Sequence, residues 1–287
     1  MKMRSFPPQL VIGLGLIAVG WPLAWSKPAA LRFFYENSFF LLWSGYALSV
    51  DGLVFARQGH SLLSRNRTAF LLLFLISSPC WWLFEFLNQY LNNWHYVLNR
   101  PVSRFEYIIR CSLHFSTVIP AVFGTAELWA SSRILSRCRQ FRALALSPAG
   151  ITNLILLGIL FLVLVITYPQ YFFPLVWVCL FLVFDGVNAL RGAPSLLDRI
   201  RQGDWRLPLA LALGALTCGF FWEMWNYYSS PKWVYTLPYF EVAPLFEMPA
   251  LGYLGYLPFG LELYSLYVLI LELTGRRGTA WYGAPQG

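Results

Sequence analysis

The 287-residue sequence is 58% hydrophobic and only 12% charged. Soluble domains carry about a quarter charged residues, so this composition excludes an ordinary water-soluble globule. The net charge of +8 would suggest a nucleic-acid partner in a soluble protein, but here the basic residues stand in short clusters between apolar runs, without any nucleic-acid-binding motif. We therefore expect an integral membrane protein with no nucleic-acid partner.

Apolar runs of about 20 residues, the length that a helix needs to cross a hydrocarbon core, recur along the chain. The predicted fold is all-α and polytopic, with about eight transmembrane helices. In chain order they are Leu10–Trp25, Phe39–Ala56, Ala69–Tyr90, Tyr107–Ala130, Ile151–Tyr168, Phe173–Leu190, Leu207–Tyr228 and Met248–Leu273.

The first apolar run follows Lys2 and Arg4, as the core of a secretory signal would. No small-x-small cleavage site follows it, and Lys27 and Pro28 interrupt the place where one would lie. We therefore interpret the run as the first transmembrane helix, although the sequence leaves cleavage open.

The last span is the least regular, because three glycines and two prolines crowd its first half. Such residues predict a broken or kinked helix. A membrane tolerates a break only where the backbone faces protein or a wet cavity.

Lysine and arginine are distributed unevenly between the two sides of the membrane. With the N-terminus inside, fifteen of them lie on the inner side and six on the outer side. Cytoplasmic loops are enriched in these residues, so both termini are predicted to be cytoplasmic.

Two halves of the chain carry matching residues. Asp51, Arg57 and Arg65 reappear as Asp185, Arg191 and Arg199 at an offset of 134 residues, and the intervening Ser-Leu-Leu segment reappears with them. Further on, Glu85-x-x-Asn88 matches Glu223-x-x-Asn226 at an offset of 138 residues. Trp94 and Tyr96 match Trp233 and Tyr235 at an offset of 139. Because each unit holds four helices, we predict two like-oriented repeats, residues 1–140 and 141–287.

The inner polar layer of the repeat consists of the two aspartates and the arginine-bearing loops after them. One interpretation has the loops grip an anionic headgroup, since arginine suits bidentate phosphate contacts. The alternative, which we favour, is ordinary positive-inside anchoring with each serine capping a short interfacial helix. The candidate headgroup contacts are Arg57, Arg65, Arg191 and Arg199.

The outer polar layer is more unusual, because a glutamate and an asparagine three residues apart share one helix face inside a span. Ionisable groups there are costly and mark a candidate functional site. Glu247 and Glu262 add acids to the irregular last span, Glu127 is matched with Glu262, and we expect these acids to converge on one or two pockets. The candidate catalytic residues are Glu85, Glu223, Glu247 and Glu262.

Lys232, in the loop after Glu223, can neutralise one of these acids.

Aromatic residues crowd the same layer, either as an interfacial belt or as the wall of a pocket. The candidate substrate-binding residues are Asn88, Trp222, Trp225, Asn226, Lys232, Trp233 and Tyr235.

The three histidines lack metal-ligand spacing, and the five cysteines are scattered without close pairs. No nucleophile elbow, metalloprotease or dinucleotide motif is present. We expect no metal and no cofactor.

The segments Phe221-Trp222-Glu223, Lys232-Trp233-Val234-Tyr235 and Phe246-Glu247-Met248-Pro249 resemble those of a family of uncharacterised bacterial multi-span proteins. More distantly, over about 30 residues, the layout is similar to that of small multi-span lycopene (carotenoid) cyclases. The resemblance implies a bacterial inner membrane and metal-free protonation of an isoprenoid by carboxyl groups. The paired acids that follow the proline in those cyclases are replaced here by Ala250-Leu251-Gly252.

The leading hypothesis is a membrane enzyme in which Glu223 and Glu247 act as general acid and base on a lipid or isoprenoid substrate, with Asn226 orienting a carboxyl. A proton-coupled transporter or flippase would use the same acids as proton carriers. A noncatalytic scaffold would use them only to hold helices together. Membrane lipids are the expected partners, and the oligomeric state stays open.

Overall fold

The computed structural model describes residues 6–239, 243–276 and 281. Within them, eight helical segments are long and apolar enough to cross a membrane, which confirms the predicted all-α polytopic fold and every predicted span to within a few residues. The segments are α1 (Pro8–Ser26), α3 (Ser38–Gln58), α5 (Arg67–Leu91), α6–α7 (Arg104–Phe115 and Val118–Ala130), α9 (Pro148–Thr167), α10–η3–α11 (Pro169–Phe172, Phe173–Leu175 and Val176–Leu190), α13 (Arg206–Tyr227) and η4–α14 (Ala250–Gly255 and Tyr256–Leu273).

Short elements connect the spans. The connecting helices are η1 (Ala29–Leu31), α2 (Arg32–Glu36), α4 (Leu62–Arg65), α8 (Arg133–Ser136), η2 (Arg137–Gln140) and α12 (Leu196–Arg201). The strands are β1 (Trp94–Val97), β2 (Lys232–Tyr235), β3 (Pro244–Leu245) and β4 (Met248–Pro249). Lys2 and Arg4 lie outside the described residues, and the predicted orientation stays a prediction.

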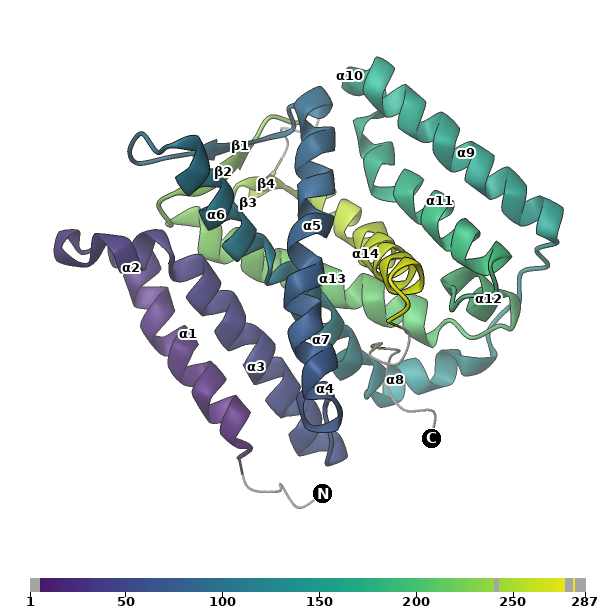
Figure 1. Ribbon diagram of the computed structural model, residues 1–287, viewed down its shortest axis with the longest axis horizontal. Helices are drawn as coiled ribbons and strands as arrows, with labels where there is room; N and C mark the ends of the chain where they lie inside the picture. The colour runs from purple at the N-terminus through teal and green to yellow at the C-terminus, as the bar shows by residue number, and fades with distance from the viewer. Residues whose placement is uncertain (1–5, 240–242, 277–280, 282–287) are drawn as a thin grey trace.

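Two helix hairpins flank a central group of helices. α1 and α3 lie side by side at the left of Figure 1, and α9 and α11 at the right. Both hairpins depend on glycine at the crossing point: a Cβ on Gly13 would lie 2.6 Å from the Gly45 carbonyl oxygen, and one on Gly158 would lie 2.8 Å from that of Cys179. Small residues let the backbones touch, which is the main source of helix association in lipid.

The fourth span is broken between α6 and α7, which the sequence analysis did not anticipate. The buried Ser77 on α5 holds the two pieces, donating its hydroxyl to the Phe115 carbonyl at 2.5 Å and accepting the Ile119 N–H at 3.0 Å. The eighth span is irregular, as predicted, but only at its start: the 3₁₀ helix η4 precedes a regular α14. Pro258 lies in the first turn of α14, where its missing N–H costs nothing.

At the inner ends of α3 and α11, the two matched aspartates cap the short helices that follow. Asp185 is fully buried and accepts the backbone N–H groups of Leu196 and Leu197 at 3.0 and 2.8 Å. Asp51 likewise accepts the N–H of Leu63 at 3.0 Å and the Ser61 hydroxyl at 2.7 Å. The aspartates therefore hold the inner loops in place, in the same way in both halves.

At the opposite end of the bundle, the outer loops of the two halves meet as an antiparallel ribbon of β1 and β2 (Figure 1). Trp94 pairs with Tyr235, and Tyr96 with Trp233. A two-fold axis that exchanged the two halves would place Trp94 on Trp233 and Tyr235 on Tyr96, so it would convert the first pair into the second. The register is therefore the one that the predicted repeat would produce, although the division of the chain into two units stays a prediction.

Candidate functional site

Each Glu–Asn pair lies near the outer end of its helix and holds the strand that follows. Asn226, which is fully buried, donates to the Trp233 carbonyl at 2.7 Å and accepts the Trp233 N–H at 2.9 Å. Asn88 donates to the Trp94 carbonyl at 2.8 Å. A side-chain amide presents one donor and one acceptor to a backbone segment, so each asparagine fixes β1 or β2 against its own helix.

In the first half, Glu85 collects three donors on a single carboxylate oxygen. The indole N–H groups of Trp81 and Trp94 donate to Oε1 at 2.9 and 3.0 Å, and the Tyr96 hydroxyl donates at 2.5 Å. The glutamate therefore orients three aromatic side chains from α5 and β1.

In the second half, Glu223 is fully buried and receives two hydroxyls on its Oε1, from Tyr235 at 2.6 Å and Tyr256 at 2.7 Å. The Trp233 indole donates to the Tyr235 oxygen at 2.8 Å. The other carboxylate oxygen, Oε2, is buried without a hydrogen-bond partner among the described residues. A proton on Oε2 would leave Oε1 able to accept both hydroxyls, so this geometry suits the charged and the neutral carboxyl alike.

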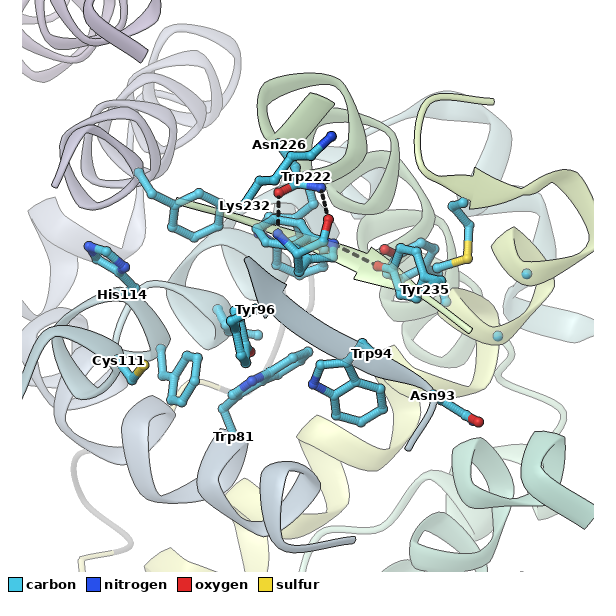
Figure 2. A pocket seen from close by; sticks show the side chains of 18 of the residues that line it. Trp81, Asn93, Trp94, Tyr96, Cys111, His114, Trp222, Asn226, Lys232 and Tyr235 are labelled. Carbon is cyan, nitrogen blue, oxygen red and sulfur yellow. Dashed lines mark hydrogen bonds between the residues drawn. The ribbon is translucent and has the colours of Figure 1, made fainter. Parts of the chain in front are cut away.

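Four aromatic side chains of the ribbon form part of the wall of a cavity of about 520 Å³. They are those of Trp94, Tyr96, Trp233 and Tyr235. This volume falls within the range of small-molecule sites, and the wall is mostly aromatic and aliphatic, as such sites are. Figure 2 shows aromatic side chains from both halves around this space. The aromatic residues of the wall are Tyr35, Phe39, Trp81, Trp94, Tyr96, Tyr107, Phe115, Phe173, Trp177, Trp222, Trp233, Tyr235 and Tyr256.

The predicted site residues divide between the wall and its support. Glu85 and Glu223 are not part of the wall and lie directly behind it, joined to it by the tyrosine hydroxyls. Trp225 lies away from the cavity, packed edge to face against Trp43 with the ring centroids 5.1 Å apart. Asn88 supports β1 from behind. The predicted substrate-binding residues on the wall are Trp222, Asn226, Lys232, Trp233 and Tyr235.

The acids converge only in part: Glu85 and Glu223 lie behind one cavity, whereas Glu262 contacts the backbone of α11. Glu247 forms an ion pair with Lys232, as anticipated for that lysine, beside the cavity rather than in it. Glu262 is buried in α14 and accepts the backbone N–H groups of Leu180 and Phe181 at 3.1 and 3.4 Å. The partners of Glu262 lie 82 and 81 residues away in the chain, so helical spacing alone could not show this contact.

Glu127 is also separate, and its suggested match with Glu262 fails. It lies near the inner end of α7, where Arg65 contacts Oε1 at 2.7 Å and the Trp281 indole donates to Oε2 at 3.3 Å. The two glutamates thus occupy different depths of the bundle.

The inner arginines serve mostly internal contacts. Arg57 donates to the Ser131 hydroxyl at 2.9 Å, Arg199 lies 3.4 Å from Asp204, and Arg191 is exposed. Ser195 accepts the Asp198 N–H at 3.0 Å, which is the predicted serine cap of a short interfacial helix. The contacts of these arginines fit the anchoring interpretation better than a phosphate site. Headgroup binding stays a prediction.

Sequence reasoning missed two features of the wall. Tyr256 reaches Glu223 from 33 residues away because Gly219 leaves room for its ring: a Cβ there would lie 2.4 Å from it. Glu36 on α2 is also buried, and it pairs with Arg32 at 2.7 Å and Arg110 at 3.0 Å. The spacing of Arg32 and Glu36, four residues apart, could have indicated the first pair, but Arg110 is 74 residues away and left no local signal.

The Tyr235 hydroxyl is held in its protonated form. Burial raises the pKa of Tyr235 well above its usual value, and the adjacent Glu223 carboxylate adds to the effect. Tyr235 therefore donates to Glu223, and of its two oxygen lone pairs one accepts from Trp233.

Comparison of the chain with protein-family models, with curated proteins and with solved structures finds no match.

Proposed function

We propose that this membrane protein is an enzyme that binds a lipid or isoprenoid substrate in the aromatic cavity and that Glu223 serves as its acid/base group. The observation that carries the proposal is the pair of hydroxyls, from Tyr235 and Tyr256, which lie on the cavity wall and both donate to one fully buried carboxyl. Buried ionisable groups within a span are costly, so a fully buried carboxyl joined to a cavity wall is a candidate acid/base group.

The proposed step moves one proton through Tyr235. Its oxygen takes a proton from a carbon beside a cationic centre of the substrate, and the electron pair of the broken C–H bond forms the new C=C bond. Its own proton passes at the same time to the Glu223 carboxylate. The reverse transfer delivers a proton to an alkene carbon. The Trp233 N–H, 2.8 Å from the tyrosine oxygen, would stabilise the negative charge that develops there during either transfer. Tyr256 donates to the same carboxylate oxygen and holds it in place for this transfer.

The other predicted acids have different roles in this proposal. Glu85 orients Trp81, Trp94 and Tyr96, on the part of the wall that α5 and β1 form. Glu247 fixes Lys232 beside the cavity, and Glu262 stays outside the reaction. The proposed location is a bacterial inner membrane, with the cavity toward the outer side and both chain ends in the cytoplasm.

The transporter hypothesis calls for a polar path from the outer glutamates to the inner aspartates. Within the described residues, the cavity wall includes neither Asp51 nor Asp185, and these aspartates are occupied with backbone N–H groups of the inner loops. This observation favours the enzyme.

Lipid profiling of cells that express Glu223→Gln tests the proposal. Glutamine keeps a carbonyl for the two tyrosine hydroxyls but cannot exchange a proton. The lipid or pigment pattern that depends on the protein should therefore disappear, although the variant accumulates normally. Glu127→Gln, the same change in a buried acid away from the cavity, is the matched control and should keep the pattern. An unchanged pattern in Glu223→Gln would overturn the proposal.

A further inference from the structure

Part of the cavity wall is exposed at two apolar spans. Leu251 and Leu254 line the cavity, yet they are 56% and 60% exposed, and both belong to η4 in the eighth apolar span. Pro174 of η3, in the sixth span, is likewise exposed and lines the same space. Residues that border both a cavity and the outside form its mouth, so one mouth lies between η3 and η4, at the ends of two apolar spans. Leu98, which follows β1 and is 41% exposed, marks a second opening of the same cavity.

The contact between the two sides of this mouth is narrow. Gly255 of η4 lies against Trp177 of α11, and a Cβ on the glycine would lie 3.0 Å from the indole ring. The mouth is thus bordered by leucines, a proline and one aromatic ring. Nothing charged among the described residues stands at this edge of the wall.

Each charged group of the wall has an ion-pair partner within the protein. Among the described residues, the wall carries Glu36, Arg110 and Lys232. Glu36 and Arg110 pair with each other at 3.0 Å, and Lys232 pairs with Glu247. A charged ligand would have to break one of these pairs or remain without a counter-charge in a mostly apolar space, which is costly.

We propose that the cavity admits an uncharged, membrane-dissolved lipid sideways through the η3–η4 mouth, rather than a phosphorylated lipid or a solute from water. The inference rests on the proposed function only in taking this cavity as the substrate site. A tyrosine hydroxyl that donates to a carboxylate can also accept a hydrogen bond from an alcohol, and the remaining wall suits a hydrocarbon chain.

Cys111, a free cysteine on the wall, provides a native reporter of access (Figure 2). Its modification can be followed by peptide mass spectrometry in the intact chain in lipid nanodiscs, with N-phenylmaleimide as the membrane-soluble reagent and a sulfonated maleimide as the water-restricted one. We expect N-phenylmaleimide to react faster.

Leu254→Trp should slow the reaction of Cys111 with N-phenylmaleimide about fivefold or more by narrowing the mouth. Leu156→Trp, on the lipid-exposed side of α9 outside the wall, should leave it unchanged. Faster reaction with the sulfonated reagent, or no effect of Leu254→Trp, would overturn the lateral mouth.

Ligand charge is tested by protection of Cys111. Farnesol at about ten times its Kd should slow modification about tenfold, whereas farnesyl phosphate at the same membrane concentration should protect far less. Equal or better protection by the phosphate, or none by farnesol, would overturn the uncharged class. The Cys111 experiments measure access and binding alone. The proposed chemistry is tested separately by the lipid pattern of Glu223→Gln, so failure of one can be told from failure of the other.

Discussion

The Tyr235 hydroxyl donates to the Glu223 carboxylate across 2.6 Å, and this contact connects an outer loop to a transmembrane helix. The tyrosine faces the cavity while the glutamate lies behind it. The pair therefore places a proton-exchanging group next to an apolar space without exposing a charge to it, and the two residues should act as a unit.

Tyr235→Phe and Glu223→Gln should each lower turnover by about 10²- to 10⁴-fold, the usual contribution of a positioned acid/base group. The double variant should be no slower than the worse single variant, because both changes interrupt the same proton path. Product formation in membranes of matched protein content measures this. Losses that multiply in the double variant would show that the two residues act independently.

Gly219→Ala should displace the Tyr256 ring, because the added Cβ would lie 2.4 Å from it. We expect a loss of about 1–3 kcal/mol in the free energy of unfolding, together with reduced turnover. Gly15→Ala is the matched control in another transmembrane helix: nothing lies within 4 Å of its added Cβ, and stability should change by no more than about 1 kcal/mol. Thermal unfolding in detergent compares the two, and equal effects would contradict the expected role of Gly219.

Asn226→Ala should loosen β2, because it leaves the Trp233 N–H and carbonyl without their side-chain partner. The expected cost is about 1–3 kcal/mol, since these groups are held against a fully buried residue. Asn88→Ala removes the corresponding contact in the first half, where the asparagine is only half-buried, and should cost less. The midpoint of thermal unfolding tests this order, and a larger loss from Asn88→Ala would reverse it.

The predicted orientation places β1 outside and the segment before α9 inside. A cysteine introduced by His95→Cys, an exposed position on β1, should react with an impermeant thiol reagent added to intact cells. One introduced by Arg142→Cys, also exposed, should react only after permeabilisation. The opposite pattern would invert the topology that the positive-inside rule predicts.

Much of the fold follows from local features of the sequence. The eight spans were predictable because a backbone in hydrocarbon must satisfy its own hydrogen bonds, so a long enough apolar run has to become a helix. The spacing of Glu223 and Asn226 was also sufficient to put both side chains on one helix face. The break at Ser116–Thr117 was not predictable, since the hydroxyl that holds it belongs to Ser77 on another helix.

The sequence by itself determined that this chain has about eight helices able to cross a membrane and that acids lie within them. Only the tertiary structure decided which acids support the cavity. Tyr256 meets Glu223 because Gly219 lacks a side chain, whereas Glu262 turns to the backbone of α11 and Glu247 to Lys232. Helix formation in a membrane depends on local composition, but the partner of a buried carboxyl depends on close packing between segments far apart in the chain, which no local pattern encodes.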